Sequence, residues 1–391
     1  MHKALKIRLY PSSAQAAFLN AQFGAVRFVY NKGLHLIRRQ YQRCGQSLSA
    51  TKDIKPLLSV AKRSRKYSWL KSYDSIALQQ ACIHLGKAFS NFFNVNLSAR
   101  YPCFKSKHGK QSSYHCMGIS CGENWIKIPK LSRIKAKVHR AISGKLKSIT
   151  VTRSQTGKYF ASLLFEDGVD YPEPNKALSE AQILGLDLGL THLLIDSNGQ
   201  KTPNPRFLKR ATQNLRRKQK SLSRKQKGSA SRSKARLLLA KCHEKLRQSR
   251  QDFQHKVSKQ LIDENQAIVV ETLKVKNMLK NKKLARHIAD AAWDSLLAKL
   301  AYKAQASGKY LVKIDQWFAS SKTCCRCHQK VDSLPLSVRL WECPHCGAAH
   351  DRDINAARNI RQQGILKLKA EGLSVSANGG LRETDTVSAV A

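Results

Sequence analysis

The chain has 391 residues, of which 42% are apolar and 7% aromatic, so it is long enough for two or three domains with a substantial core. Its 71 Lys and Arg against 25 Asp and Glu give a formal net charge of +46. A charge of this size attracts phosphates and predicts nucleic-acid partners. The charge leaves the activity open, because a ribosomal or chromatin protein would share it. The apolar content excludes a disordered polycation.

Targeting signals are not evident in the sequence. Residues 1–8 lack the apolar stretch of a signal peptide. No apolar run approaches the roughly 18 residues that a membrane span requires. We therefore expect a cytoplasmic protein without a membrane partner, in which the eleven cysteines are free thiols and metal ligands and not disulfides.

The first half of the chain changes from a helical to a β-rich pattern. Residues 1–10 alternate apolar and charged side chains and predict a strand. Ser12 or Ser13 can cap a following helix, and a second helix is expected from about Ser75 within a helical region that ends near Asn96. Further strands are predicted at 125–129, 148–151 and 158–165, which the first strand could join in a small barrel or an open sheet. The proline-containing segment 167–176 is typical of a linker.

A second domain is predicted to begin near Ala181. Strands are expected at 183–187, 192–196, 267–270 and 310–314, with a helix through 289–300 and a last helix from about Asp353. Residues 206–256 carry eighteen Lys and Arg against two acids and predict a basic helical hairpin that turns at 228–231. Such a face is either solvated or tracks phosphates, and the pattern favours neither. Residues 368–391 are predicted to be a disordered tail.

Four cysteines in two pairs predict a structural zinc site. Cys324 and Cys327 are followed after fifteen residues by Cys343 and Cys346, which is the four-thiolate pattern of a closed tetrahedral site. Cys325 falls outside the symmetric spacing and is expected to be no ligand. Three histidines could substitute as ligands but are not needed: His328, His345 and His350.

Three acids stand in contexts that would bring them to one centre. Asp187 lies between glycines in a predicted strand, Glu271 ends a buried strand, and Asp353 enters a helix. Carboxylates buried at strand ends are costly without a cation, and Mg²⁺ prefers hard oxygen ligands. Each acid alone has a structural explanation, such as a turn, a cap or a helix N-terminus. Asp351 is the rival of Asp353 and could cap the helix instead.

These blocks together resemble the transposon-encoded TnpB family, which is related to type V CRISPR effectors. The resemblance runs from residue 2 to about residue 377 and joins the cysteine array to a series of short blocks. They are KIRLYP (6–11), RFVYN (27–31), LQQA (78–81), FKSK (104–107), GLDLG (185–189), VVETL (269–273), SSKTC (320–324) and DRDINAARNI (351–360). The family often has Asp where this chain has Thr272.

The resemblance implies a multidomain α+β fold. A wedge-like β-barrel would comprise residues 1–10 and 97–175, and a helical recognition domain residues 11–96. A RuvC-type, ribonuclease-H-like α/β nuclease domain would comprise a core at 181–320, an inserted zinc ribbon at 321–350 and a C-terminal helix at 351–367.

The resemblance also implies an RNA-guided DNA endonuclease of a mobile element, found with the prokaryotic nucleoid. It would cut double-stranded DNA beside a short motif, with two Mg²⁺ held by Asp187, Glu271 and Asp353 and one structural Zn²⁺. Its partners would be a guide RNA from the mobile element and the DNA target, and the oligomeric state stays open. Nucleic-acid contacts are expected from Tyr73, Ser75, Gln79, Lys105 and Lys107, and from Arg216, Arg217 and Lys218 on the basic hairpin.

Two other functions remain compatible with the sequence. A transposase can also use carboxylates on this fold, although we see no helix-turn-helix module in the pattern. A protein that coats or represses nucleic acid with inactive acids would share the charge. Co-purified RNA would distinguish the first alternative, and loss of cutting with retained binding in Asp187→Ala would distinguish the second.

Overall fold

The computed structural model describes residues 2–107, 112–335 and 337–376, and the chain divides into two compact units at Asp170 and Tyr171. The boundary lies inside the predicted linker. The second unit therefore begins about ten residues before the expected position near Ala181. None of the helices in these residues is both long and apolar enough to cross a lipid bilayer.

The first unit combines a helical layer with a seven-stranded sheet of order β2-β6-β7-β1-β5-β4-β3. Leu5, Ile7 and Leu9 on β1 point into a core shared with the helices. Its helical elements are α1 (Ser13–Cys44), the π-helix η1 (Ala50–Ile54), α2 (Lys55–Arg63), the 3₁₀ helix η2 (Ser68–Ser72) and α3 (Ser75–Phe93). Its strands are β1 (His2–Tyr10), β2 (Ser112–Cys116), β3 (Ser120–Cys121), β4 (Trp125–Lys127), β5 (Ile134–Lys137), β6 (Lys145–Arg153) and β7 (Tyr159–Glu166).

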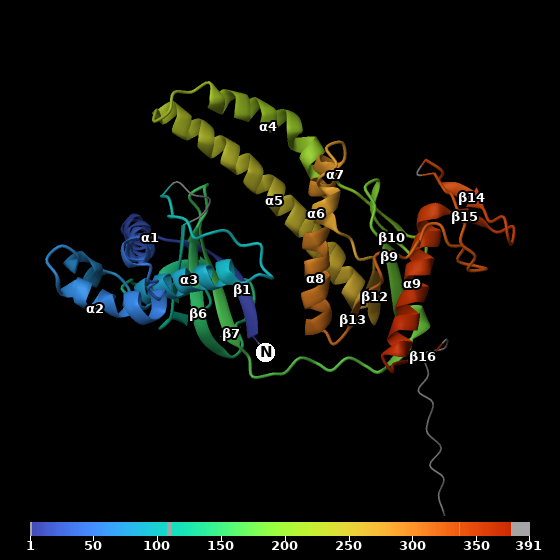
Figure 1. The fold of residues 1–391 in the computed structure, drawn as a ribbon, viewed down its shortest axis with the longest axis horizontal. Coiled ribbons are helices and arrows are strands. Elements are labelled where there is room, and N and C mark those ends of the chain that lie inside the picture. Colours follow the sequence, from blue (N-terminus) through green and yellow to red (C-terminus); the bar gives the residue numbers. More distant parts are fainter. Residues whose placement is uncertain (1, 108–111, 336, 377–391) are drawn as a thin grey trace, which may run out of the picture. The chain divides into compact units, whose positions relative to one another are not determined.

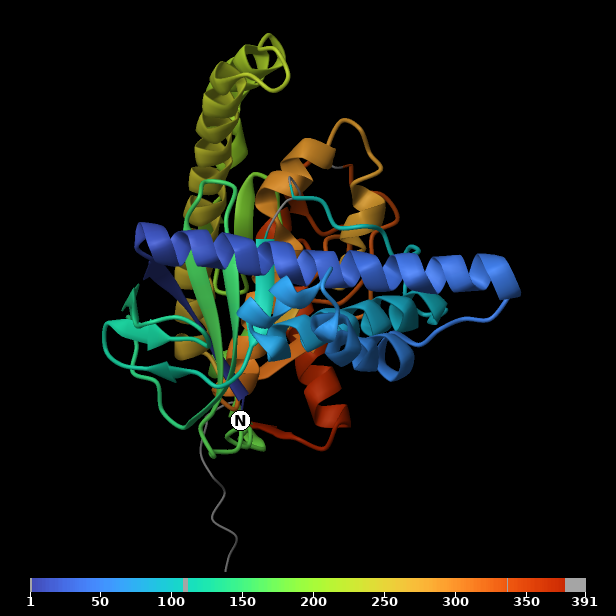
Figure 2. The same ribbon diagram turned by 90° about the vertical axis from the view of Figure 1, so that its left-hand side faces the viewer.

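Helix α1 begins and ends where its sequence dictates. Ser12 caps it by accepting a hydrogen bond from the backbone N–H of Gln15, whose side chain in turn accepts from the N–H of Ser12. Gly45 ends it with φ +68°, a left-handed conformation that glycine adopts without strain. Figure 2 shows α1 running across the strands of its unit as one unbroken helix.

The second unit is a three-layer arrangement around a five-stranded sheet of order β11-β10-β9-β12-β13 (Figure 1). Helix α9 covers one face, and α5 and α8 cover the other. The sheet strands are β9 (Ile183–Asp187), β10 (His192–Asp196), β11 (Lys201–Pro203), β12 (Ala267–Val270) and β13 (Tyr310–Lys313). The helices are η3 (Glu180–Gln182), α4 (Phe207–Ser223), α5 (Ala230–Glu264), α6 (Val275–Met278), α7 (Ala285–Ala291), α8 (Trp293–Ala306) and α9 (Arg352–Ala370). Two small pairs complete the unit: β14 (Leu340–Glu342) with β15 (Ala349–Asp351), and β8 (Ala177–Ser179) with β16 (Ser374–Ser376).

Two sequence predictions were wrong here. The helix through 289–300 is two helices, α7 and α8, because Ala292 between them has φ +53°. The tail does not begin at 368. Leu368 is fully buried on α9, and Ser374–Ser376 forms a strand parallel to Ala177–Ser179. The rest of the predicted tail, residues 377–391, lies outside the described residues.

Candidate functional site

The pairing register brings Asp187 and Glu271 together. Strands β9 and β12 are parallel, with Gly185 opposite Val269 and Leu186 opposite Val270. One step further along this register places Asp187 opposite Glu271. Ile183 and Val269 pack in the core under α9, whereas Leu184 and Leu186 pack on the α5 side. Because side chains alternate between faces, Asp187 and Glu271 both belong to the α9 face.

Helix α9 lies close enough to β9 to bring Asp353 to the same edge. A Cβ added at Gly185 would lie 2.2 Å from the carbonyl oxygen of Ala357, so only glycine allows this approach. The Arg361 guanidinium also donates a hydrogen bond of 2.9 Å to the carbonyl of Ile183. Asp353 lies one helical turn before Ala357, on the same side of α9. The third acid thus approaches the end of β9 from the helix N-terminus.

The three carboxylates interact electrostatically. Burial, and next the negative charges of Glu271 and Asp353, raise the pKa of Asp187 to about 7. Burial also raises the pKa of Glu271, against the effect of a hydrogen bond of 2.6 Å from the Ser320 hydroxyl. Like charges at a half-buried site favour a bound cation. The donor set, three carboxylates with oxygen ligands only, fits Mg²⁺.

Asp351 and Asp353 have different surroundings. Asp351 is the N-cap of α9, and its carboxylate accepts hydrogen bonds from the backbone N–H groups of Asp353 and Ile354. It also pairs with Lys201 at 2.6 Å. Asp353 has its carboxylate on the side of the other two acids and pairs with Arg339 at 3.0 Å. Asp351 is therefore occupied by structural contacts.

Sequence reasoning missed three side chains that contact these acids: Ser320, Arg339 and Lys201. Ser320 lies in the block SSKTC, but nothing in its spacing indicates Glu271 as its partner. Arg339 and Lys201 are two of 71 Lys and Arg residues, and nothing in the sequence distinguishes them from the others. Thr272, which departs from the family pattern, donates a hydrogen bond of 2.6 Å to the carbonyl of Ile314 and joins the ends of β12 and β13.

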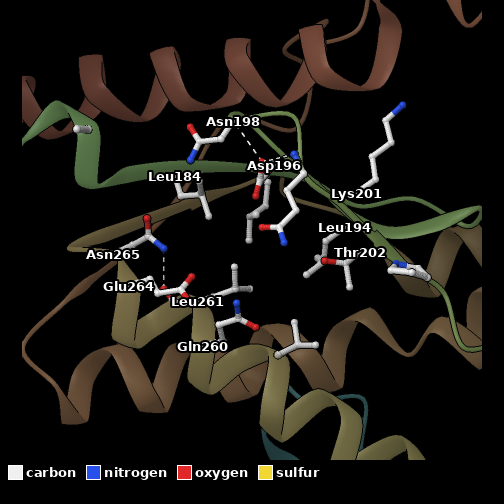
Figure 3. A pocket seen from close by; sticks show the side chains of 15 residues that line it. Leu184, Leu194, Asp196, Asn198, Lys201, Thr202, Gln260, Leu261, Glu264 and Asn265 are labelled. Atoms are coloured by element: carbon white, nitrogen blue, oxygen red, sulfur yellow. Dashed lines mark hydrogen bonds between the residues drawn. The ribbon is translucent and has the colours of Figure 1, made fainter.

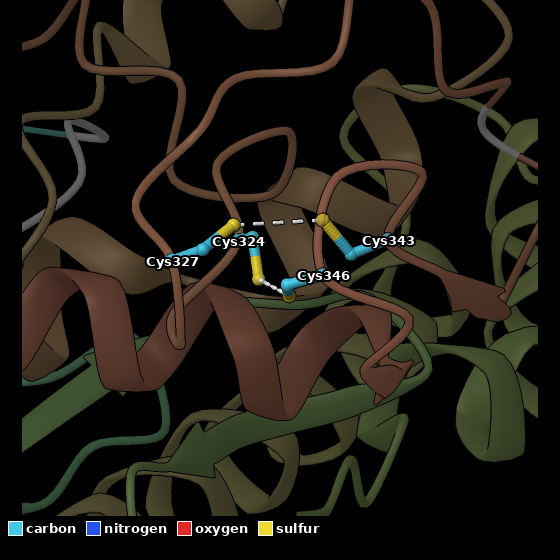
Figure 4. Close-up of side chains that lie close together, drawn as sticks. All are labelled: Cys324, Cys327, Cys343 and Cys346. Atoms are coloured by element: carbon cyan, nitrogen blue, oxygen red, sulfur yellow. Dashed lines mark hydrogen bonds between the residues drawn. The ribbon is translucent and has the colours of Figure 1, made fainter.

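The four predicted cysteines form one cluster (Figure 4), and could hold a zinc ion. The sulfur atoms all lie within 4.8 Å of one another, and two pairs, Cys324 with Cys346 and Cys327 with Cys343, are 3.7 Å apart. Tetrahedral zinc with Zn–S bonds of about 2.3 Å requires sulfur separations of about 3.8 Å. All eleven cysteines lie in the described residues and none forms a disulfide, as predicted.

The two halves of the cluster have the same backbone geometry. The carbonyl of Cys324 accepts from the N–H of His328, and that of Cys343 accepts from the N–H of Gly347, both at 2.9 Å. His328 and Gly347 occupy equivalent positions and both have a left-handed φ, +61° and +66°. Glycine adopts this conformation freely, whereas histidine is strained there.

Two residues next to the cluster, His350 and Cys325, are not among its four cysteines. The Nε2 atom of His350 lies 3.0 Å from the sulfur of Cys324, at hydrogen-bonding distance from the cluster's edge. Cys325 is outside the cluster, as predicted, and its backbone N–H donates to Asn355 on α9. This contact ties the first cysteine pair to the helix that carries Asp353.

A cavity of about 410 Å³ lies on the opposite face of the sheet from the acids (Figure 3). Leu184 and Leu186 on β9 and Gln260 and Leu261 on α5 line it. Asp196 at its wall accepts hydrogen bonds from the backbone N–H groups of Asn198 and Gln200, which form a turn after β10. The acids lie at the ends of β9 and β12 and do not line this cavity.

The residues expected to contact nucleic acid occupy two regions. Tyr73, Ser75 and Gln79 lie at or near the start of α3, and Lys105 and Lys107 follow that helix. The Lys105 ammonium lies 3.9 Å from the centre of the Tyr30 ring, and burial lowers its pKa. Arg216, Arg217 and Lys218 are on α4, which pairs with α5 in the predicted basic hairpin (Figure 1).

Comparison with known proteins places the chain in a family. A profile described as "Probable transposase" matches residues 168–282, and one described as "Cas12f1-like, TNB domain" matches 293–360. A Streptomyces pristinaespiralis protein named "Putative RNA-guided DNA endonuclease" is 40% identical over 386 residues, which cover 97% of this chain and 92% of that protein. The chain belongs to the TnpB family.

Other members and structures are more distant. The Escherichia coli K12 protein named "Putative RNA-guided DNA endonuclease InsQ" is 28% identical over 401 residues, covering 98% of this chain and 97% of that protein. A solved structure entitled "Cryo-EM structure of the Cas12f1-sgRNA-target DNA complex" matches with 16% identity and a TM-score of 0.36, over 92% of this chain and 99% of that one.

One profile match and the structure differ over a helix-turn-helix module. A profile described as "Helix-turn-helix domain" matches residues 1–46, although the sequence pattern showed no such module. In the structure these residues form β1 and the single helix α1, with no turn between two helices. The period-3.6 pattern from Ser13 to Cys44 is therefore continuous, which explains why it did not suggest two helices.

Proposed function

We propose that this chain is an RNA-guided DNA endonuclease that hydrolyses phosphodiester bonds at Asp187, Glu271 and Asp353. The observation that carries the proposal is the meeting of three carboxylates from distant segments, where burial and then the charges of Glu271 and Asp353 raise the pKa of Asp187 to about 7. Carboxylates buried together at the ends of two strands destabilise a fold unless a cation binds them. The names of the relatives support the same activity.

The order of the five-stranded sheet supports a RuvC-type, ribonuclease-H-like nuclease domain. Strand β9 is central, antiparallel to β10 and parallel to β12, and α9 packs on it. The first unit, with its seven-stranded sheet and helical layer, corresponds in this proposal to the wedge and recognition domains. The zinc ribbon then comprises the cysteine cluster and the β14–β15 pair.

Asp187, Glu271 and Asp353 would hold two Mg²⁺ ions. The chemistry that Mg²⁺ supplies when bound is activation of the attacking water and stabilisation of the leaving oxygen. The protein's part is to fix the carboxylates. Glu271 is oriented by the Ser320 hydroxyl, and Asp353 by the first turn of α9. Arg339, now paired with Asp353, is placed to pair with a substrate phosphate instead.

Substrate binding rests on the positive charge of both units. Arg216, Arg217 and Lys218 on the hairpin would contact phosphates of the guide RNA or the DNA without reading bases. Neutralising all three should weaken binding to every sequence and reduce the salt dependence of affinity. Tyr73, Ser75, Gln79, Lys105 and Lys107 would contact the DNA beside the target. Gln79→Ala should then change motif preference more than RNA affinity.

Sequencing of the co-purified nucleic acid and a cleavage assay together test the proposal. RNA from the end of the mobile element should co-purify, and the complex should cut DNA that matches it. Asp187→Ala, Glu271→Ala and Asp353→Ala should each lose cutting by about a thousand-fold or more, without additivity, and keep RNA binding. Asp351→Ala is the matched control, which should lose about 1 kcal/mol of stability and keep substantial cutting.

A transposase is the second candidate, because two matching profiles are described as a transposase and a helix-turn-helix domain. It predicts joined DNA products and recognition of element ends without RNA. Such products in the absence of RNA would contradict our proposal. Full cutting by all three acid variants would contradict the acidic site that both candidates use. Absence of cutting by the unmodified protein with its RNA would instead leave a protein that only binds nucleic acid.

A further inference from the structure

Trp317 is the most exposed aromatic side chain that the structure describes, with 81% of its surface accessible. It lies in the segment between β13 and the first cysteine pair. An exposed indole offers a large flat apolar surface on which a ligand can pack. Its surroundings indicate which ligand.

The segment that carries Trp317 is held firmly on both sides. The backbone N–H of Trp317 donates a hydrogen bond of 2.7 Å to the Asp315 carboxylate. The next side chain, Phe318, packs against the core under α9. Further on, the carbonyl of Ser320 accepts from the Asn359 amide at 2.8 Å. Trp317 is therefore exposed on a fixed segment, which is how a preorganised binding residue is presented.

The same segment touches the acidic site. Ser320, three residues after Trp317, donates its hydroxyl hydrogen to Glu271. Three residues span at most about 10 Å, so the indole lies within reach of the nucleotides next to the acids. Lys274, three residues after Glu271, has its ammonium 5.9 Å from the centre of the Trp317 ring. An aromatic face and a positive charge thus lie together beside the carboxylates.

A nucleotide is the ligand that matches both groups. A nucleobase stacks on an indole, and its phosphate pairs with an ammonium. A base inside a duplex has both faces covered, so the base must be unpaired. The net charge of +46 favours a polyanion over an apolar protein partner at this position.

We propose that Trp317 stacks on an unpaired base of the DNA strand held at the acidic site, close to the phosphate that is cut, with Lys274 on the adjoining backbone. This inference rests on the proposed nuclease function and adds a base-stacking position to it. The contact fixes the strand along its length, so it determines which phosphate reaches the carboxylates.

Abasic scanning tests the contact without relying on cutting. The full chain with its co-purified RNA, carrying Asp187→Ala to prevent cleavage, is titrated with single-stranded DNA oligonucleotides that each lack one base. One abasic position should weaken binding about ten-fold, as should Trp317→Ala with the intact oligonucleotide. The two changes together should weaken binding no more than either alone. Trp317→Phe keeps a ring and should retain most of the affinity, whereas Trp317→Leu should not.

Controls separate this inference from the proposed function. Tyr302→Ala removes a half-exposed aromatic side chain on α8 and should show no coupling to any abasic position. If no position couples to Trp317→Ala while the unmodified chain cuts DNA, the inference is wrong and the nuclease proposal stands. If coupling is found but Asp187→Ala still cuts, stacking stands and the proposed catalytic site is wrong.

Two further outcomes would overturn the stacking assignment. Coupling confined to RNA oligonucleotides of the same sequence would place Trp317 on the guide and not on the cut strand. A fall in thermal stability of several degrees in Trp317→Ala would show that protein covers the indole in solution. Unchanged stability together with coupling on DNA is the result we expect.

Discussion

The acidic site and the cysteine cluster lie on adjoining parts of the second unit but are assembled in opposite ways. The cysteine ligands come from two short turns 15 residues apart, each closed by its own backbone hydrogen bonds. The acids come from positions 187, 271 and 353, and meet only after β9, β12 and α9 have packed. A locally built site depends on its metal for folding. A site built by the whole domain forms without the metal, and repulsion between its carboxylates then destabilises the metal-free fold.

The largest expected effect comes from Cys343→Ser. Removing one thiolate should release zinc, and with it a metal-linked folding free energy on the order of 10 kcal/mol for the cluster. Because β15 leads directly into the N-cap of α9, cutting should also fall at least ten-fold. Zinc content by mass spectrometry and a cleavage assay measure both effects. Cys325→Ser is the matched control, and full zinc content in Cys343→Ser would exclude it as a ligand.

Asp187→Asn should stabilise the metal-free protein. The folded state raises the pKa of Asp187 to about 7, so it binds this proton more tightly than the unfolded chain does. Stability from this group is complete at low pH and is lost as pH rises toward 7. The free energy of unfolding of Asp187→Asn should therefore increasingly exceed that of the unmodified protein between about pH 4 and 7, by at most about 4 kcal/mol. Above about pH 7 the difference should stay constant.

Denaturant unfolding in the presence of a chelator measures this difference at each pH. Added Mg²⁺ should stabilise the unmodified protein and have little effect on Asp187→Asn. A difference that does not vary with pH would show that the charge of Asp187 costs nothing.

Gly185→Ala tests the close packing of α9 on β9, which brings Asp353 to the other two acids. The added methyl group would lie 2.2 Å from the carbonyl of Ala357 and push α9 from the sheet, which should cost about 1–3 kcal/mol and reduce cutting. Thermal unfolding and cleavage rates are the measurements. Gly24→Ala, where the nearest atom is 3.8 Å away on a flexible side chain, is the control and should be neutral or slightly stabilising. Equal behaviour of the two variants would refute the close approach.

The smallest expected effect concerns the two cysteine turns. His328→Gly should relieve the left-handed strain and stabilise the zinc-bound cluster by about 1 kcal/mol, whereas Gly347→Ala should destabilise it by a similar amount. Rates of zinc release to a chelator should move in opposite directions. Movement in the same direction would mean that the two turns are not equivalent.

Sequence reasoning predicted the two candidate sites by different routes. The cysteine spacing was sufficient, because both turns are local. For the acids, the strands ending at Asp187 and Glu271 were predicted correctly, but only the parallel register puts both on one face. The break at Ala292 was not predictable, since alanine favours helix and its left-handed conformation comes from tertiary contacts. Neighbouring Asp290 holds the N-terminus of α4 and Arg250, which no local pattern indicates.

The parallel pairing of β16 with β8 gives the second unit a closed chain path. Ser374 lies opposite Ala177, so a segment near the start of the unit and one near residue 376 are paired as neighbouring strands. A protein joined to this unit behind Ser376 would start beside the linker to the first unit. New ends opened at the Gly228 turn, with the old ones bridged by a short peptide, would preserve every strand of the sheet. The second unit is thus suited to circular permutation, with the turn of its basic hairpin as the position of the new ends.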